Sequence, residues 1–174
     1  MERKSFRIVL ILAVAAFFVI QACKKDEEPE DTQPQEFVAD NSTFSGFMSW
    51  PLETTNLGPD PALGASFPGN DMTVYRKIYF KNGQDPVNGL YPQGTVIVKH
   101  SFNPAFTLNE CKAMVKRGGS FNTAGNGWEW FILNPDGTIA VDNDGNPLRG
   151  ANLAEGECTT CHTQAVEKDY VFSK

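Results

Sequence analysis

Three residues near the end of the 174-residue chain, Cys158, Cys161 and His162, have the types and spacing of a covalent cofactor site. Cysteines three positions apart lie on one side of a helical turn, so both thiols can add to the two vinyl groups at one edge of a haem. A histidine that follows directly can then bind the iron as its proximal ligand. The motif therefore predicts one haem c, covalently attached through Cys158 and Cys161, with His162 as the metal ligand.

The start of the chain has the pattern of an export signal. Three basic residues precede an apolar run over residues 8–20, which is shorter than the ~20 residues of a membrane-spanning helix. The run ends in Val-Ile-Gln-Ala before Cys23, which resembles the cleavage site of bacterial lipoproteins. We therefore expect a signal peptide over residues 1–22 and a lipid on Cys23. Export agrees with the haem motif, because c-type haem is attached outside the bacterial cytoplasm.

Residues 23–36 combine the lipidated cysteine with an acidic tether. Residues 24–36 hold eight charged side chains and no large apolar one, so they cannot bury enough surface to fold. The acidic start resembles the signal that places some lipoproteins on the cell surface, and an ordinary solvated linker explains it equally well. We expect a lipid anchor in the cell envelope, at the outer membrane, with the protein in the periplasm or on the cell surface.

Residues 37–174 have the size and composition of one folded haem domain. The chain is 41% hydrophobic and 21% charged, which is too apolar for a disordered protein. Its formal net charge of −6 argues against nucleic acid as a partner.

The residue pattern of this domain predicts an α+β fold, a mainly antiparallel β-sheet with a few flanking helices and the Cys-x-x-Cys-His motif on a C-terminal helix. Aromatic residues at near-helical spacing predict a helix over residues 42–50, and a segment rich in glycine and proline predicts a loop over residues 52–71. Residues 108–116 fit either a helix or a strand. Runs of β-branched and aromatic residues predict strands at 72–80, 95–101, 128–133 and 138–141.

Two other uses of the motif's cysteines remain open. A Cys-x-x-Cys pair can form a redox disulfide, although such a pair does not require the adjacent histidine. A zinc ion takes four ligands, and Cys111 or His100 could complete such a set. Exported thiols tend to oxidise, which disfavours zinc. If the other cysteines are modified, Cys111 has no partner within the chain, and we expect it to be a small, buried apolar residue.

A β-rich body with this motif near its end differs from the all-helical cytochromes c and c′. The chain instead resembles the cytochrome P-460 family and its relative cytochrome c′-β, from about residue 75 to residue 172. The order and spacing of short segments carry this resemblance, namely residues 76–79, 91–99, 113–116, 127–130, 158–162 and 169–172. It implies a mainly antiparallel β-fold, a five-coordinate iron and, because family members are often dimers, a possible homodimer.

In the catalytic members of the family a lysine is cross-linked to the haem edge, and Lys99 matches its position. Strand alternation puts Ile97 and Lys99 on one face and Val98 and His100 on the other. The resemblance thus implies that Lys99 lies beside the haem, and the cross-link itself stays open.

The family also implies haem chemistry on a small nitrogen compound. The leading hypothesis is the oxidation of hydroxylamine to a nitrogen oxide, with electrons passing to a redox partner. The alternatives are the binding of nitric oxide or carbon monoxide without turnover, as in cytochrome c′-β, and simple electron transfer. The sequence therefore leaves open whether the protein is an enzyme.

The remaining groups near the iron are less well defined by the pattern. A base that takes substrate protons could be Glu129, Glu155 or Glu157, and Arg76 could bind a haem propionate or lie near the iron. Simple electron transfer would need a sixth ligand, which could be His100, Met48, Met72 or Met114. The aromatic residues that could cap the iron are Phe44, Phe47, Phe80, Phe102, Phe106 and Phe121.

Overall fold

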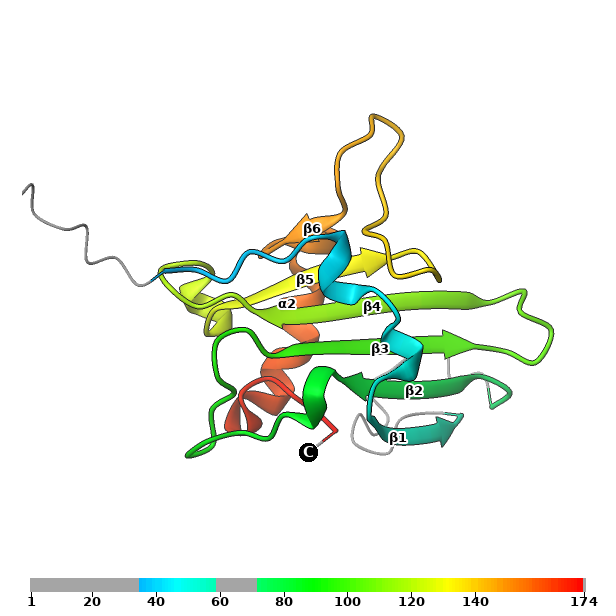
Figure 1. Ribbon diagram of the computed structural model, residues 1–174, viewed down its shortest axis with the longest axis horizontal. Helices are drawn as coiled ribbons and strands as arrows, with labels where there is room; N and C mark the ends of the chain where they lie inside the picture. The colour runs from blue at the N-terminus through cyan, green and yellow to red at the C-terminus, as the bar shows by residue number, and fades with distance from the viewer. Residues whose placement is uncertain (1–34, 59–71, 174) are drawn as a thin grey trace, which may run out of the picture. The chain divides into compact units, whose positions relative to one another are not determined.

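The computed structural model describes residues 35–58 and 72–173, which form a six-stranded sheet in which each strand pairs with the next one along the chain (Figure 1). Every pairing is antiparallel, so the predicted fold class is confirmed. The strands are β1 (Leu52–Leu57), β2 (Tyr75–Phe80), β3 (Val96–Phe102), β4 (Asn109–Lys116), β5 (Trp128–Leu133) and β6 (Arg149–Gly150).

The predicted signal peptide, Cys23 and most of the predicted tether lie outside the described residues. In residues 35–58 and 72–173, none of the helices is both long enough and apolar enough to cross a lipid bilayer.

Strands were predicted correctly where β-branched and aromatic residues dominate. β5 coincides with the predicted strand at 128–133, β3 lies one residue later than the predicted 95–101, and β2 occupies the second part of 72–80. Residues 108–116, which fit a helix or a strand, contain β4, because apolar side chains alternate along one of its faces.

Three local predictions were wrong in part. Residues 52–57, expected in a loop, form β1, an edge strand with mostly exposed side chains that is held by its ladder to β2. Residues 138–141 make only isolated bridges instead of a strand. The helix expected over 42–50 is divided into two 3₁₀ helices, η1 (Asn41–Phe44) and η2 (Phe47–Ser49), because Gly46 between them has a φ of 66°.

Alternation along the strands gives the sheet two chemically different faces. The first face carries Val98 opposite Ala113, and the second carries Ile97 opposite Met114. Each face packs into its own hydrophobic core. The first core includes Phe44, Phe47, Tyr79, Val96, Val98, Ala113, Val115, Phe131 and Leu133. The second core includes Ile78, Phe80, Tyr91, Ile97, Met114, Trp128, Trp130, Tyr170 and Val171.

Different ends of the domain cover the two faces (Figure 1). The first face is covered by η1 and η2, whose Phe44 and Phe47 rings lie 5.0 Å from Phe131 and 5.7 Å from Tyr79, measured between centroids. The second face is covered by the C-terminal segment, which contains η6 (Leu153–Gly156), α2 (Glu157–His162) and η7 (Thr163–Lys168).

The last residues of the predicted tether are held against the domain. Arg117, directly after β4, forms an ion pair with Glu36 at 2.8 Å, and the Phe37 amide donates to the Arg117 carbonyl at 2.9 Å. The chain therefore already contacts the folded domain at Glu36.

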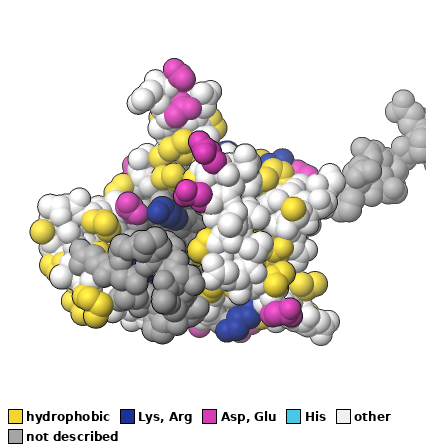
Figure 2. All heavy atoms as spheres, turned by 180° about the vertical axis from the view of Figure 1, so that it is seen from behind, with side chains coloured by type: hydrophobic (Ala, Val, Ile, Leu, Met, Phe, Trp, Pro, Cys, Tyr) yellow, Lys and Arg dark blue, Asp and Glu magenta, His cyan; other side chains and the backbone are white. Residues whose placement is uncertain are grey.

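The loop between β5 and β6 projects from the sheet and carries acidic side chains at its tip (Figures 1 and 2). At its base, Gly137 has a φ of 90°, and a Cβ atom at this position would lie 2.7 Å from the Phe44 carbonyl oxygen. The turn after β5 and η1 therefore approach each other at a distance that only glycine permits.

The first testable prediction compares two glycines of this loop. Gly145 has a similar φ of 85°, but a Cβ atom there would meet no neighbour within 4 Å. Alanine at either position is strained by about 1–2 kcal/mol, whereas only Gly137→Ala also forces backbone atoms apart, at a further cost of about 1–3 kcal/mol. Denaturant unfolding should therefore show a larger loss of stability for Gly137→Ala than for Gly145→Ala. Equal losses would contradict the close approach to η1.

Candidate functional site

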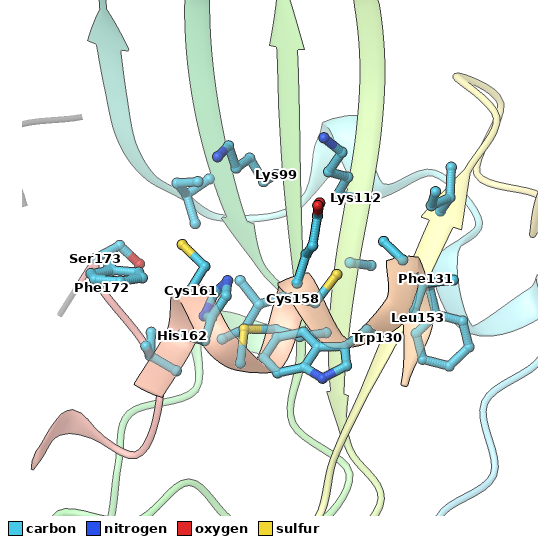
Figure 3. A pocket seen from close by; sticks show the side chains of 18 residues that line it. Lys99, Lys112, Trp130, Phe131, Leu153, Cys158, Cys161, His162, Phe172 and Ser173 are labelled. Carbon is cyan, nitrogen blue, oxygen red and sulfur yellow. The ribbon is translucent and has the colours of Figure 1, made fainter. Parts of the chain in front are cut away.

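A cavity of about 360 Å³ lies between the second face of the sheet and α2 (Figure 3). Cofactor and ligand pockets commonly enclose ~300–1,000 Å³. Its walls are mostly apolar and come from strands β2 to β5 on one side and from the C-terminal segment on the other. The lining side chains used below are Ile78, Ile97, Lys99, Lys112, Met114, Trp130, Leu153, Glu157, Cys158, Cys161, His162, Val171 and Phe172.

The helix α2 presents both motif cysteines to this cavity. It begins directly after Gly156, whose φ of 87° lies in the left-handed region that glycine adopts readily. Cys158 and Cys161 are one helical turn apart, both line the cavity, and neither forms a disulfide. Burial raises the pKa of both thiols, and the charge of Lys99 partly opposes this for Cys161. The two thiols are therefore protonated and close together on one wall.

The orientation of His162 is determined by its neighbours. Its Nδ1 donates a hydrogen bond to the Tyr170 carbonyl oxygen at 2.6 Å. Because a carbonyl can only accept, Nδ1 carries the proton and Nε2 keeps the lone pair of the neutral ring. The centroids of Trp130 and Phe172 lie 4.6 and 5.2 Å from that of the imidazole. Burial lowers the pKa of His162, which favours the neutral form that binds metals.

Lys99 reaches the same cavity from β3. It pairs with Lys112 of β4, and Figure 3 shows both amines at one end of the cavity, across from the cysteines. After burial and the bond to Tyr170, the charge of Lys99 is the third influence on the pKa of His162, and it lowers that pKa further. The predicted alternation is confirmed, because Ile97 and Lys99 face the cavity while Val98 lies in the first core.

The donor set of the cavity fits a c-type haem. Two unpaired thiols and the lone pair of a neutral imidazole come from one helix, and the facing wall supplies apolar strand residues and two lysines. Cys158 and Cys161 would hold the macrocycle and His162 would hold the iron. The zinc alternative is disfavoured, because Cys111 and His100 pair with each other on the first face of the sheet.

The prediction that Glu129 acts as a base at the iron needs correction. Glu129 lies between Trp128 and Trp130 on β5, and alternation turns its side chain to the first face, away from the cavity. There its carboxylate is 1% exposed and accepts hydrogen bonds from Arg149 at 2.7 and 2.9 Å. Its role is to bind Arg149, which in turn donates to the Ala39 carbonyl at 2.6 Å.

The other candidate residues, Arg76, the carboxylates and the possible sixth ligands, differ in whether they reach the cavity. Arg76 is buried, and its guanidinium donates a hydrogen bond to the Gly58 carbonyl. Its role at the haem stays a prediction. Among the three candidate carboxylates, Glu157 lines the cavity. Met114 lines it as well, whereas His100 is bonded to Asn109 at 2.7 Å on the first face.

Several contacts of the site were not foreseen from the sequence. Trp130, besides its contact with the imidazole, donates from Nε1 to Thr159 Oγ1 at 2.9 Å and so ties β5 to α2. Thr159 in turn donates to the Ala151 carbonyl at 3.1 Å. Lys112 could have been found, because a hairpin of residues 96–116 puts it opposite Lys99, but this required recognising β4 as a strand.

A comparison with protein families matches residues 60–173 to the family described as Cytochrome P460. The match includes β2 to β6 and the C-terminal segment, and thus every described residue of the cavity wall. A search of curated proteins found no match to the chain.

The second testable prediction concerns Cys111, which of the described cysteines is the one that does not line the cavity. It is 1% exposed, and burial raises the pKa of its thiol to about 11. Since the thiolate is the reactive form, iodoacetamide at pH 8 should leave Cys111 unmodified in the native protein and modify it after denaturation. Peptide mass mapping measures both. Rapid alkylation of native Cys111 would contradict its burial in the first core.

Proposed function

The chain belongs to the cytochrome P460 family, which implies binding of haem c, and on that premise we propose that it is a monohaem c protein that oxidises hydroxylamine. The proposed attachment is through Cys158 and Cys161, with His162 on the iron. One observation carries the proposal: the three motif residues and Lys99 line a single apolar cavity.

The residues of α2 are suited to hold the haem, and forming the two thioether bonds would oxidise or reduce neither the thiols nor the haem. Each thiol would add across a vinyl group, so that its sulfur forms a carbon–sulfur bond and its proton goes to the neighbouring vinyl carbon. His162 would donate the Nε2 lone pair while Nδ1–H stays on Tyr170, the usual arrangement in which the second nitrogen of a metal-binding histidine is held by an acceptor.

The reaction assigned to the site is the oxidation of hydroxylamine to a nitrogen oxide; where the product is nitric oxide, the reaction releases three protons and three electrons. When bound, the haem supplies a redox-active iron at which a small nitrogen compound can bind. The electrons require an external acceptor, and we assign this role to a redox partner protein. Glu157, which lines the cavity and is exposed, is suited to pass protons to solvent.

A lysine at the haem edge is the second element of the proposal. Lys99 lies on the wall opposite α2, and its charge affects Cys161 and His162. We assign Lys99 to the haem edge, where its charge, or a covalent bond to the ring, would tune the site. Arg76 is retained as a further candidate on the same face.

The apolar lining supports a second candidate function. Isoleucine, methionine, leucine, valine and aromatic residues make most of the wall, and such a surface suits a neutral diatomic gas. A protein that binds nitric oxide or carbon monoxide without turnover would show an ordinary high-spin spectrum. A reduced band shifted strongly to the red would indicate a cross-linked haem, and a six-coordinate low-spin spectrum would favour electron transfer.

The location of the protein is part of the same proposal. A lipid on Cys23 would attach the domain to the cell envelope, at the outer membrane, through the acidic segment that precedes Glu36. Export also places the thiols where c-type haem is attached.

The third testable prediction concerns attachment. The double variant Cys158→Ser/Cys161→Ser, produced in cells equipped for cytochrome maturation, should lose all haem that survives denaturation, because serine cannot form the thioether bond. Haem staining after denaturing electrophoresis measures this. The matched control, Cys111→Ser on the first face, should keep its stain. Equal staining of the two proteins would rule out attachment at α2.

The fourth testable prediction concerns turnover. Lys99→Met should lower hydroxylamine-dependent reduction of an electron acceptor by about 100-fold, the size of effect seen when one electrostatic group is removed from an active site. The control is Lys77→Met, since Lys77 lies opposite His100 on the first face. It should retain activity within about fivefold, as expected for a peripheral charge. If the wild-type protein binds nitric oxide but does not oxidise hydroxylamine, the enzymatic proposal fails and gas binding replaces it.

A further inference from the structure

The acceptor of the His162 hydrogen bond lies in an unusual piece of backbone. Asp169 and Tyr170 follow η7 and both have positive φ, at 52° and 68°. Two consecutive residues other than glycine in this region are uncommon, and a bulky tyrosine there is an outlier. Such conformations persist only where surrounding contacts determine them. The Tyr170 carbonyl reaches Nδ1 of His162 from this turn.

The contacts that determine the turn converge on the Asp169 side chain. Lys116, at the end of β4, donates to both carboxylate oxygens at 2.7 and 2.8 Å. The Asn126 amide donates to Oδ1 at 2.6 Å, and the backbone N–H of Tyr91 donates to Oδ2 at 2.7 Å. Trp128 Nε1 donates to the Asp169 carbonyl at 2.8 Å. Three segments of the chain, at Tyr91, at Lys116 and at residues 126–128, thus hold this one residue.

This ion pair is buried, which makes a purely stabilising role a poor explanation for it. The Lys116 and Asp169 side chains are 9% and 0% exposed, and burial lowers the pKa of Lys116 against the opposing effect of Asp169. Taking two charges out of water often offsets their attraction, so an apolar pair of similar size can be equally stable. A buried, fully bonded carboxylate does, however, fix geometry.

We propose that Asp169 is a positioning residue for His162, the residue that would bind the iron. Its carboxylate accepts hydrogen bonds from Lys116, Asn126 and the Tyr91 amide, and these bonds fix the turn whose Tyr170 carbonyl accepts the hydrogen bond from His162. The inference rests on the proposed function, because it takes His162 as the residue that would bind the iron. The hydrogen bond to Nδ1 sets both the direction of the imidazole and the electron density at Nε2. Asp169 therefore acts on the iron through the backbone, without contact with haem or substrate.

The fifth testable prediction uses two sets of variants of the haem-loaded, full-length protein. Asn126→Gly removes one donor to Asp169, and glycine accepts the φ of 48° at this position. Lys116→Met/Asp169→Asn removes both buried charges together, so that no unpaired ion is left. In both proteins the iron–histidine stretching frequency of the ferrous form, measured by resonance Raman, should shift downward. The shift should be larger in the double variant.

A second readout separates positioning from general loss of stability. Exchange of the His162 Nδ1 proton with solvent, followed by NMR in the carbon monoxide complex, should become faster in both proteins, because the acceptor of that proton is held less firmly. The control is Glu129→Gln, which weakens an ion pair of a similarly buried carboxylate on the first face. It should lower stability and leave both His162 signals unchanged.

The outcomes distinguish this inference from the function on which it rests. If the ferrous wild-type protein is five-coordinate and has no iron–histidine band, the proposed haem ligation is wrong, and the role of Asp169 falls with it. If the wild-type band is present but Asn126→Gly and the double variant leave it and the exchange rate unchanged, only the positioning role is refuted. A shift of equal size in Glu129→Gln would also refute it.

Discussion

Strand alternation is the constraint on which the organisation of this domain depends. Along β2 to β5, every second side chain points to the same face, so the register determines which functional groups can meet. It brings Lys99, Met114 and Trp130 to the second face, where they meet α2. It also sends Glu129 and His100 to the first face. A slip of one residue in β3 would exchange Lys99 for His100 at the cavity.

Among the described residues, each face of the sheet has a buried carboxylate in an ion pair that joins the sheet to the segment that covers it. On the first face, Glu129 and Arg149 connect β5 and β6 to the chain near Ala39. On the second face, Lys116 and Asp169 connect β4 to the turn after η7. Both pairs connect the sheet to a covering segment, but of the two only Lys116–Asp169 lies next to the backbone that accepts a hydrogen bond from the proposed iron ligand.

The cavity joins a short local motif to a wall that is distant in the sequence. Three functional groups lie within five residues of α2, whereas the opposite wall is assembled from strands between residues 75 and 133. The helix can therefore present thiols and imidazole as a unit, and the sheet supplies the rigid surface that limits what fits against them. Trp130 is where the two parts meet, since it contacts His162 and donates to Thr159.

How much could be predicted from the sequence depended on the range of each interaction. The placement of Cys158 and Cys161 on a C-terminal helix follows from local spacing, and so does the alternation that puts Ile97 and Lys99 on one face; both of these were predicted correctly. The edge strand β1 was missed, because its ladder to β2 leaves no apolar pattern. The side chain of Glu129 could not be assigned to a face from the sequence, because this required knowing which face of β5 contacts α2. The hydrogen bond from His162 to the Tyr170 carbonyl could not be predicted either, because it depends on the positive φ angles of Asp169 and Tyr170.

The most direct test of the central claim is the position of the iron in crystals of the haem-loaded protein. Anomalous scattering at the iron absorption edge measures this position independently of any assumption about the cofactor. The account predicts a single iron in the cavity between α2 and the second face, within bonding distance of His162 Nε2. An iron bound elsewhere, or bonded to His100 on the first face, would contradict it.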